Sequence, residues 1–401
     1  MVVVHLAVVV DAAADVVAVE AEAAEEEAGK LIMATPMKDG LGLEAVQRIS
    51  NAITSIDSNF TGDHFVSSAK KQIVNLELRQ RVDCLIDLLH QHLPDNFESS
   101  ANLLEKIPEY WDGGDENDPL RGFAAWPIID YVGKHGLDYP VRSLELLKRL
   151  TPLFSAEFAI RPFLLQHEEL TLSTMQQWCN DPSDHVRRLV SEGSRPRLPW
   201  GQQLKPFIAN PTPIFHLLEP LKDDPSDYVR RSVANNLNDI AKDHPQLIID
   251  HCLQWHDDTD DNRQWIIRHA TRTLVKQGYP GVFTLLGYTD NPQISLSAFE
   301  LDANSIEIGE SLGFCFDLST DAEIEQQFVV DYAVHYAKAN GKTSHKVFKL
   351  KNLALAPGET ATLAKNHSFR PVTTRKYYAG RHAIEILING ESIARQEFDL
   401  L

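Results

Sequence analysis

The segment Ser191–Gly201, with the sequence SEGSRPRLPWG, combines a carboxylate, two guanidinium groups and an indole. Two prolines and two glycines prevent it from continuing the preceding helix, so we expect an ordered, extended crossing. Its four candidate functional side chains would then be presented together: Glu192, Arg195, Arg197 and Trp200. The alternative is a long connection between helical repeats in which Trp200 plugs the core.

A second carboxylate lies upstream, at Glu157 in the motif SAEFAIRP. We expect Glu157 to open the inner helix that precedes the helix leading into Ser191–Gly201. An acid in the first turn of a helix is stabilised by the helix dipole, which is a purely structural alternative. As a functional group, Glu157 would add a second carboxylate beside the segment that carries arginine and tryptophan.

The elements that must position these residues are predicted to be helical pairs. From Leu43 onward apolar residues recur at helical spacing, and prolines divide the chain into segments of helix length. The motif DPSDHVRR at Asp181–Arg188 recurs as DPSDYVRR at Asp224–Arg231, and a looser third copy contains residues 267–269. These repeats predict a HEAT-like α-solenoid.

Each part of the repeated motif has a predicted role. The Asp-Pro pair ends one helix, the serine (Ser183 or Ser226) caps the next, and the valine enters the core. Arginines of such repeats often bind neighbouring repeats. One arginine of each V-R-R pair is therefore expected to be structural, and the sequence does not say which.

Around residues 287–303 the period changes from helical to alternating. Residues 328–336 and 384–388 alternate as strands do, and turn signals separate such runs at Asn340-Gly341, Pro357-Gly358 and Asn389-Gly390. About a hundred residues of short strands predict a small all-β, immunoglobulin-like sandwich. The Cys…Trp…Cys spacing of antibody domains is absent.

The predicted sandwich carries a marked charge asymmetry. Between Lys338 and Arg381 ten residues are basic and only Glu359 is acidic, in a chain whose formal net charge is −19. A solvated, lysine-rich face is one explanation. Interleaved rings favour a surface that follows a phosphate backbone; they belong to His367, Tyr377, Tyr378 and His382.

Composition sets the outer limits of the interpretation. The chain has 401 residues, 43% of them hydrophobic and 24% charged, as in soluble globular domains. Four scattered cysteines without a C-x-x-C pair argue against a disulfide framework and a zinc–thiolate site, and favour a reducing cytoplasm. The acidic balance means that any polyanion must bind to a local basic face.

The predicted organisation is mainly α with a small β domain. We expect a low-complexity, disordered extension at residues 1–36, a helical domain at 37–290 and the sandwich at 291–401. Residues 1–32 form a Val-, Ala- and Glu-rich run whose apolar part is too short to span a bilayer, and no basic n-region marks a signal peptide. We expect a misassigned start there, with Met33 or Met37 as the first residue.

Common catalytic and cofactor motifs are absent from the sequence. Residues 40–45 partly mimic a dinucleotide fingerprint, but no strand precedes them and no βαβ unit follows. The sequence has no P-loop, G-x-S-x-G or H-E-x-x-H motif. His90 and His92 are expected on a helix surface rather than on a metal. We predict neither a metal nor a cofactor.

Three stretches together resemble a known family: VRRLVSEGSRPRLPWG at Val186–Gly201, EFAIRPF at Glu157–Phe163 and VRRSVANNLND at Val229–Asp239. They are similar to the AlkC branch of the AlkC/AlkD-type DNA alkylation repair glycosylases, which have HEAT-like repeats. The resemblance covers the chain from about Met37 to Leu401, including the C-terminal sandwich that some AlkC members carry. SEGSRPRLPWG is the specific part, because the V-R-R repeats alone are weak evidence.

The resemblance implies a monofunctional DNA N-glycosylase of base excision repair. Such enzymes hydrolyse the N-glycosidic bond of cationic N-alkylated purines, chiefly of the 3-methyladenine type, without drawing the base into a deep pocket. A cationic base is a good leaving group, so the demand is for a carboxylate that steadies an oxocarbenium-like sugar and orients water. Glu157 and Glu192 are the catalytic candidates. Trp200 and Phe158 would contact the sugar or the modified base.

The expected partner is double-stranded DNA that contains alkylated bases, bound by a cytoplasmic monomer without a membrane. Arginines and lysines would hold the flanking phosphates. The candidate DNA-binding residues are Arg187, Arg188, Arg195, Arg197, Arg230, Arg231, Arg268, Lys346, Lys349, Arg375 and Lys376.

Two other function classes compete with the enzyme. A non-catalytic HEAT-repeat scaffold that binds DNA or protein is favoured by periodicity alone, because such repeats more often form binding surfaces. Two acids beside Trp200 on one concave wall would argue against a scaffold. A cell-surface adhesion module is suggested by the sandwich and opposed by the lack of a signal peptide and of cysteine pairs.

Overall fold

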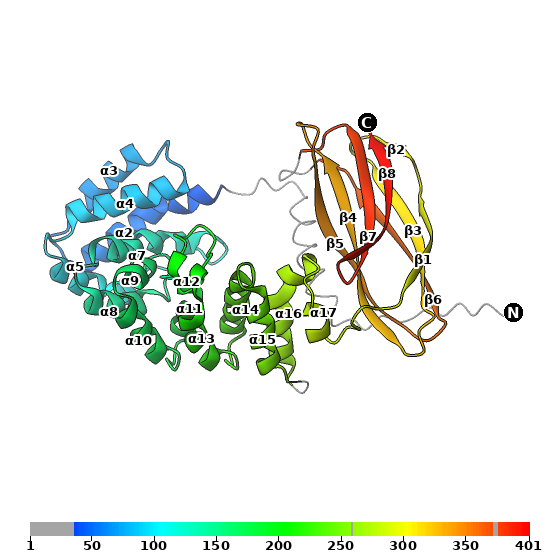
Figure 1. Ribbon diagram of the computed structural model, residues 1–401. Coiled ribbons are helices and arrows are strands. Elements are labelled where there is room, and N and C mark those ends of the chain that lie inside the picture. Colours follow the sequence, from blue (N-terminus) through cyan, green and yellow to red (C-terminus); the bar gives the residue numbers. More distant parts are fainter. Residues whose placement is uncertain (1–35, 258–259, 372–375) are drawn as a thin grey trace. The chain divides into compact units, whose positions relative to one another are not determined.

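The computed structural model describes residues 36–257, 260–371 and 376–401 (Figure 1). The chain forms two compact units: the described residues up to Pro94 together with Glu109–Pro127, and Asp95–Pro108 together with Ile128–Leu401. Apart from Pro36, the extension expected at residues 1–36 lies outside the described residues, as does the candidate start Met33.

The first unit is helical. The helical spacing of apolar residues expected from Leu43 onward is seen on α2 (Leu43–Ile56), where Val46, Ile49 and Ile53 are fully buried and Ile56 is half-buried. The other elements are η1 (Met37–Leu41), α3 (Gly62–Gln72), α4 (Leu78–His92) and η2 (Arg121–Ala125). The helices α6 (Ile107–Tyr110) and α7 (Trp126–His135) fall at the boundary of the two units.

The second unit begins with helices and ends with strands. Its helices start with α5 (Phe97–Leu104), α8 (Pro140–Leu150), α9 (Arg161–Gln166), α10 (Glu168–Trp178), α11 (Asp184–Gly193), α12 (Lys205–Ala209) and α13 (Thr212–Leu218). They continue with η3 (Glu219–Leu221), α14 (Asp227–Ala241), α15 (Pro245–Trp255), α16 (Asp261–Lys276) and α17 (Val282–Leu285). Successive helices α11, α14 and α16 pack on one another.

The repeated motif builds two similar helix starts, but not as expected. Val186 and Val229 are buried as predicted. Ser183 and Ser226 stand at the N-cap positions of α11 and α14, yet neither side chain caps its helix, so that prediction is wrong. The motif's first aspartate instead accepts the serine backbone N–H, at 2.9 Å in both copies, and this turn leads the chain into each helix.

The strands form a two-sheet sandwich, drawn from yellow to red in Figure 1. One sheet has the order β1-β3-β6 and the other β2-β8-β7-β4-β5. The strands are β1 (Ser295–Leu301), β2 (Ser305–Ile306), β3 (Ser311–Ser319), β4 (Gln326–Ala337), β5 (Thr343–Leu355), β6 (Thr360–Ser368), β7 (Gly380–Ile388) and β8 (Glu391–Leu400). Their shared core is rich in aromatic side chains from both sheets.

The predicted turns lie where the sequence indicated. Asn389 (φ 47°) and Gly390 (φ 78°) connect β7 to β8 with two consecutive left-handed residues, the requirement of a tight hairpin turn. The four cysteines are free. Within the described ranges, no helix combines the length and hydropathy that a transmembrane span requires.

Candidate active site

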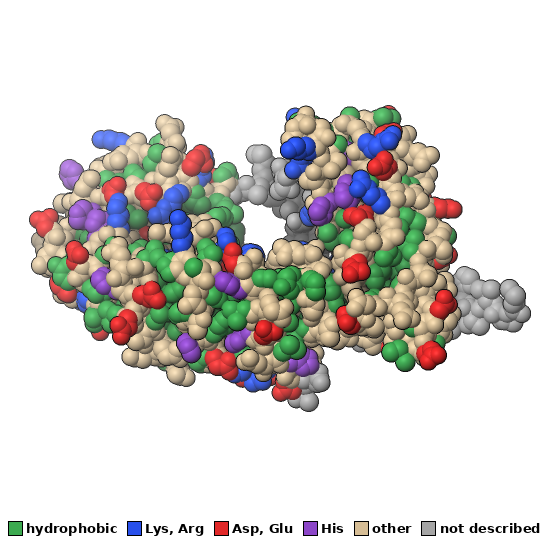
Figure 2. Space-filling model, viewed as in Figure 1, with side chains coloured by type: hydrophobic (Ala, Val, Ile, Leu, Met, Phe, Trp, Pro, Cys, Tyr) green, Lys and Arg blue, Asp and Glu red, His purple; other side chains and the backbone are tan. Residues whose placement is uncertain are grey.

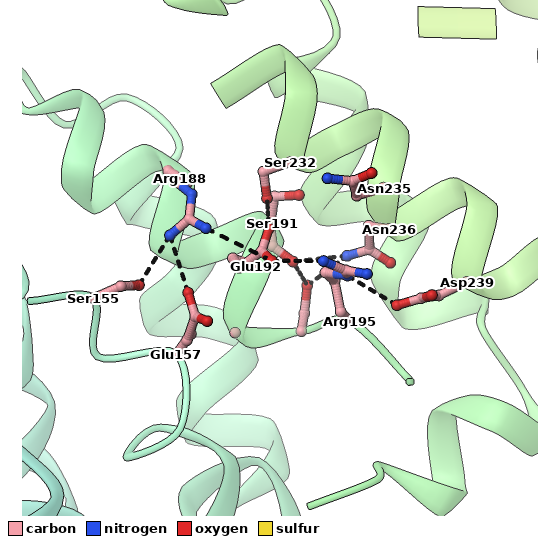
Figure 3. Close-up of polar contacts among 12 residues, drawn as sticks. Ser155, Glu157, Arg188, Ser191, Glu192, Arg195, Ser232, Asn235, Asn236 and Asp239 are labelled. Carbon is pink, nitrogen blue, oxygen red and sulfur yellow. Dashed lines mark hydrogen bonds and ion pairs between the residues drawn. The ribbon is translucent and has the colours of Figure 1, made fainter. Parts of the chain in front are cut away.

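The candidate site centres on Arg188, near the middle of α11 (Figure 3). Its Nη1 donates to Glu157 Oε2 at 3.0 Å and to Ser155 Oγ at 3.0 Å. Its Nη2 lies 3.6 Å from Glu192 Oε1, one helical turn along α11. One guanidinium therefore links the two predicted catalytic carboxylates, which the structure brings together.

Glu192 is the more deeply buried carboxylate. Its side chain is 6% exposed and both of its oxygens accept hydrogen bonds. Oε1 accepts from Arg195 Nη1 at 2.6 Å, and Oε2 accepts from the Ser232 hydroxyl of α14 at 2.6 Å. Glu192 is thus held in one orientation by its own segment and by the next helix.

The ion pairs continue from Glu192 across to α14. Arg195 Nε donates to Asp239 Oδ2 at 2.8 Å, and Lys242 Nζ lies 2.8 Å from the other oxygen of that carboxylate. Asp239 is almost completely buried, as is Arg195. Buried charges of this kind are tolerated because each has an opposite charge and hydrogen bonds. Alternating acids and bases therefore fix the geometry between α11 and α14.

Glu157 is placed differently from the expectation. It does not open a helix, because α9 begins four residues later, at Arg161, and Glu157 lies in the preceding turns. Stabilisation by the dipole of that first turn is therefore not its role. Its side chain is 15% exposed, more than that of Glu192. Of the two carboxylates, Glu157 is the one that an external ligand reaches more readily.

Burial dominates the ionisation of Glu157. It raises the pKa of this carboxyl group, the cation of Arg188 opposes the rise, and the nearby Glu192 carboxylate adds to it. The carboxylate therefore ionises at a higher pH than an exposed glutamate. The ionised form of such a buried carboxylate is stabilised when a further positive charge comes close.

Trp200 lies on the surface. Its side chain is 68% exposed, so the alternative that it plugs the core is wrong. Its φ of 63° is unusual for a bulky residue and indicates that the neighbouring packing imposes the conformation. Leu198 is the residue of this segment that enters the core instead. Phe158, next to Glu157, is half-buried.

Sequence reasoning missed Tyr228. The guanidinium carbon of Arg188 lies 4.6 Å from the centre of its ring, so Arg188 has acids and an aromatic face as neighbours. The ring is 40% exposed on α14. The signal was available, because Tyr228 occupies in the second motif copy the position that His185 occupies in the first.

The structure distinguishes the two arginines of each V-R-R pair. Arg187 makes two bonds to the Asp224 carboxylate, at 2.6 and 2.9 Å, and Arg230 donates to the backbone carbonyl of that residue at 2.6 Å. Both side chains are largely buried. Arg187 therefore reaches the next motif copy, whereas Arg230 holds the turn before its own helix. The second arginine of each pair, Arg188 or Arg231, faces elsewhere.

The other predicted phosphate contacts of the helices differ in exposure. Arg231 is 65% exposed, although it pairs with Asp227 one turn earlier at 2.6 Å. Arg197 makes a two-bond pair with Asp243, at 2.6 and 2.7 Å, and is partly exposed. Arg268 is exposed and donates to Gln264.

The basic residues of the sandwich lie on exposed positions. Lys346 and Lys349 are exposed on β5, which is an edge strand of the five-stranded sheet. Figure 2 shows Lys, Arg and His side chains over the β4–β5 side of the sandwich. Lys376 Nζ lies 5.4 Å from the centre of the Tyr378 ring. Arg375 lies outside the described residues.

Two histidines proposed for that basic surface belong to the core. His367 is buried between the hydroxyl groups of Tyr332 and Tyr336, at 3.1 and 3.0 Å. His382 is also buried, and its ring bonds to the Tyr378 carbonyl oxygen at 3.0 Å. Among the described residues, no group of three or more His, Cys, Asp or Glu side chains could hold a metal ion.

The C-terminal domain and most of the chain are similar to known proteins. Residues 295–401 match the family described as "Uncharacterised protein YhaZ, C-terminal Ig-like domain". The chain is 35% identical to the uncharacterized protein YhaZ of Bacillus subtilis over 356 residues, which cover 88% of this chain and 96% of YhaZ. The solved structure of the alkylpurine DNA glycosylase AlkC of Pseudomonas fluorescens, bound to DNA containing an abasic-site analogue, superimposes with a TM-score of 0.84. That pair is 37% identical, covering 92% of this chain and all of AlkC.

The chain belongs to the family of AlkC and YhaZ. The resemblance drawn from SEGSRPRLPWG and the two other stretches is therefore confirmed. So is an Ig-like C-terminal domain after a helical region. Within this AlkC-type chain, the turn before α9 and the helices α11 and α14 bring two acids together with a central arginine and nearby aromatic rings.

Proposed function

We propose that this protein is a DNA N-glycosylase that releases cationic N-alkylated purines, of the 3-methyladenine type, from double-stranded DNA. The main support for this proposal is the Glu157–Arg188–Glu192 cluster, which lies in a chain similar over 92% of its length to the alkylpurine DNA glycosylase AlkC. Hydrolysis leaves an abasic site, and the AlkC structure holds an abasic-site analogue.

Glu157 is the proposed catalytic carboxylate. When the bond to a cationic base breaks, positive charge moves to the sugar, and a fixed carboxylate stabilises that charge and orients the attacking water. The greater exposure of Glu157 and its burial-raised pKa support this role, because its ionised form is stabilised by each added positive charge. No general acid is needed, since the base leaves as a neutral purine.

Glu192 is proposed to act beside it as the second carboxylate of the site. Its two hydrogen bonds from Arg195 and Ser232 fix its position, and through Arg188 it fixes that of Glu157. Its negative charge lies close enough to Glu157 to raise the pKa of that group. The pair therefore forms a local negative field that suits a cation.

Three aromatic rings of the site are proposed to contact the lesion. Trp200 and Phe158 would pack on the deoxyribose or the modified base, and Tyr228, stacked on Arg188, adds a third ring. Aromatic faces attract cations, so a positively charged base gains more from them than a neutral one does. The base would be approached from outside rather than enclosed, because Trp200 is 68% exposed and Tyr228 is 40% exposed.

Double-stranded DNA is the proposed partner, bound by a monomeric, cytoplasmic protein whose helices form a HEAT-like solenoid. Because the chain carries a net charge of −19, phosphate binding depends on local clusters of exposed Arg and Lys side chains. We assign it to Arg231 and Arg268 on the helices and to Lys346, Lys349 and Lys376 on the sandwich. Arg187 and Arg230 are largely buried and are proposed to act only structurally, Arg187 by binding Asp224 of the next motif copy and Arg230 by binding the turn before its own helix.

Release of free base from methylated duplex DNA tests the function. The double substitution of Glu157 and Glu192 by Gln should abolish release while keeping much of the DNA binding, because both acids would be neutralised without loss of volume. If the wild-type chain binds DNA but releases no base, the alternative of a non-catalytic scaffold replaces the enzyme. Wild-type release by the double variant would remove both carboxylates from the mechanism.

A further inference from the structure

Arg161, at the start of α9, is fully buried beneath the Ser191–Gly201 segment. Its Nη1 donates to the Gly193 carbonyl oxygen at 3.0 Å, and its Nε donates to the Gln202 carbonyl oxygen at 2.5 Å. These two acceptors lie at opposite ends of the stretch that contains Arg195, Arg197 and Trp200. One guanidinium therefore closes this irregular stretch into a loop.

The packing around Arg161 is equally close. A Cβ atom added at Gly193 would lie 2.7 Å from Ile160 Cγ2, so the end of α11 is seated directly on the residue that precedes Arg161. A Cβ atom at Gly201 would lie 3.4 Å from Arg161 Nε. The loop thus approaches α9 through residues without side chains, which is a reason for the glycines of this motif.

The other anchors of the loop lead to a different element. Arg195 binds Asp239 on α14, and Arg197 binds Asp243 just after that helix. Toward α9, the loop is held by the two side-chain hydrogen bonds from Arg161 to its backbone carbonyl groups. Because Glu157 lies four residues before Arg161, the same contacts set the Glu157 turn against the loop.

We propose that Arg161 is a positioning residue that holds the Glu157 turn and the 193–202 loop in register, so that Glu157, Arg188 and Trp200 meet the lesion together. The inference rests on the proposed function but concerns a residue that does not touch DNA. The planar fork of arginine suits this task, since it reaches two carbonyl groups at once, whereas a lysine ammonium is a single point.

The charge of Arg161 is supported by its surroundings. Burial and Arg195 lower its pKa to about 10, while Glu157, Asp239 and Glu192 oppose that shift. Arg161 therefore remains protonated near neutral pH. Three buried or half-buried cations (Arg161, Arg188 and Arg195) stand against three acids, so the cluster is close to charge balance. Replacement of Arg161 by a neutral residue would leave the Gly193 and Gln202 carbonyl groups without their donor and would leave the acids of the cluster in excess of its cations.

The test compares Arg161→Met and Arg161→Lys with the control Arg142→Met. Arg142 is a mostly buried arginine of the same unit that pairs with Glu105 at 2.7 Å and does not contact the loop. Trypsin can cleave the loop after Arg197, whereas Pro196 protects the bond after Arg195. The rate of cleavage between Arg197 and Leu198, followed by mass spectrometry, reports release of the loop independently of glycosylase activity.

Trypsin should cleave the Arg161→Met variant between Arg197 and Leu198 at least about tenfold faster than the wild type, because the loop opens locally. Its single-turnover rate of base release should fall by about 10²-fold, the effect of a small misplacement of reacting groups, while the dissociation constant for undamaged duplex changes little. Arg161→Lys should lie between it and the wild type on both readouts. Arg142→Met should match the wild type both in its rate of tryptic cleavage and in its rate of base release.

Three results would separate the possibilities. Unchanged cleavage in a folded Arg161→Met variant overturns the clamp, and faster cleavage with an unchanged single-turnover rate overturns its positioning role. If Arg161→Met does not fold, Arg161→Lys decides, since wild-type values on both readouts overturn the proposal. If the wild type releases no base, the proposed function fails, and the cleavage assay still reports whether Arg161 holds the loop.

Discussion

The two carboxylates of the site are expected to differ sharply when each is replaced alone by glutamine. Glu157→Gln should reduce the single-turnover rate of base release and leave the free energy of unfolding almost unchanged. Glu192→Gln should reduce both. The reason is their surroundings: Glu157 is partly exposed beside Arg188, whereas Glu192 is buried with both oxygens bonded.

The magnitudes follow from these contacts. Loss of one fixed charge that stabilises a transition state costs about 10²–10³-fold in rate, which we expect for Glu157→Gln. Its stability should change by less than about 1 kcal/mol, because an ionised carboxylate is already disfavoured by burial and a neutral amide is not. For Glu192→Gln the loss of a buried ion-pair partner costs about 3 kcal/mol, the low end of the usual range, since Arg195 keeps Asp239.

Two measurements on the same preparations check this prediction. Single-turnover release of methylpurine from methylated duplex, quantified by chromatography, gives the rate, and urea denaturation gives the free energy of unfolding. Arg142→Met is the control for general destabilisation, since it lies outside the site. If Glu157→Gln keeps the wild-type rate, or destabilises as much as Glu192→Gln does, the division of roles derived from exposure and bonding is incorrect.

Three further predictions concern the DNA-facing surface and one buried acid. Replacing the sandwich lysines Lys346, Lys349 and Lys376 by Glu should weaken duplex binding and flatten its salt dependence by about 0.9 log unit per lost phosphate contact; an unchanged salt slope means that the sandwich does not touch DNA. Trp200→Ala should slow base release by about tenfold without lowering the melting temperature, because the ring is exposed; a lower melting temperature with normal release would assign it a structural role. Burial raises the pKa of Asp331 to about 6, so its ionisation costs stability that accumulates as the pH rises from the unfolded value through about 6. Asp331→Asn should therefore raise the free energy of unfolding by about 2–3 kcal/mol near pH 7 and leave it unchanged at a pH below the unfolded value; equal gains at both pH values would contradict the assignment.

The sequence predicted the elements better than the faces they present. Alternation at residues 328–336 and the Asn389-Gly390 turn led to the correct strands and hairpin. The same pattern could not place His367, since a histidine at an inward position of β6 binds two tyrosine hydroxyl groups from another sheet. Residues that meet only through sheet packing leave no local signal.

The two arginines of each V-R-R pair show the same limit on a helix. Adjacent helical residues point about 100° apart, so the two arginines of a pair face different surroundings. Both are arginine, so the sequence alone does not tell which one binds a neighbouring repeat. Asp224 decides it in the structure, because it binds Arg187 from the preceding motif copy. The Ser226 side chain does not cap its helix, and its hydroxyl group instead donates to the Asp184 carboxylate of the preceding motif copy at 2.9 Å, a contact between copies that the local sequence does not reveal.

Comparison of the two motif copies shows how the surroundings of Arg188 on α11 differ from those of Arg231 on α14. Arg231 stands in the second copy where Arg188 stands in the first, and Asn235 stands where Glu192 stands. Asn235 accepts a hydrogen bond from Arg272 and pairs with the His269 ring, so a neutral amide stands there in place of the Glu192 carboxylate. Arg231 is exposed rather than tied between acids. Repetition therefore supplies two similar helix pairs. Glu192, at the position that Asn235 occupies in the second copy, and Glu157, from an irregular turn, together provide the paired carboxylates around Arg188.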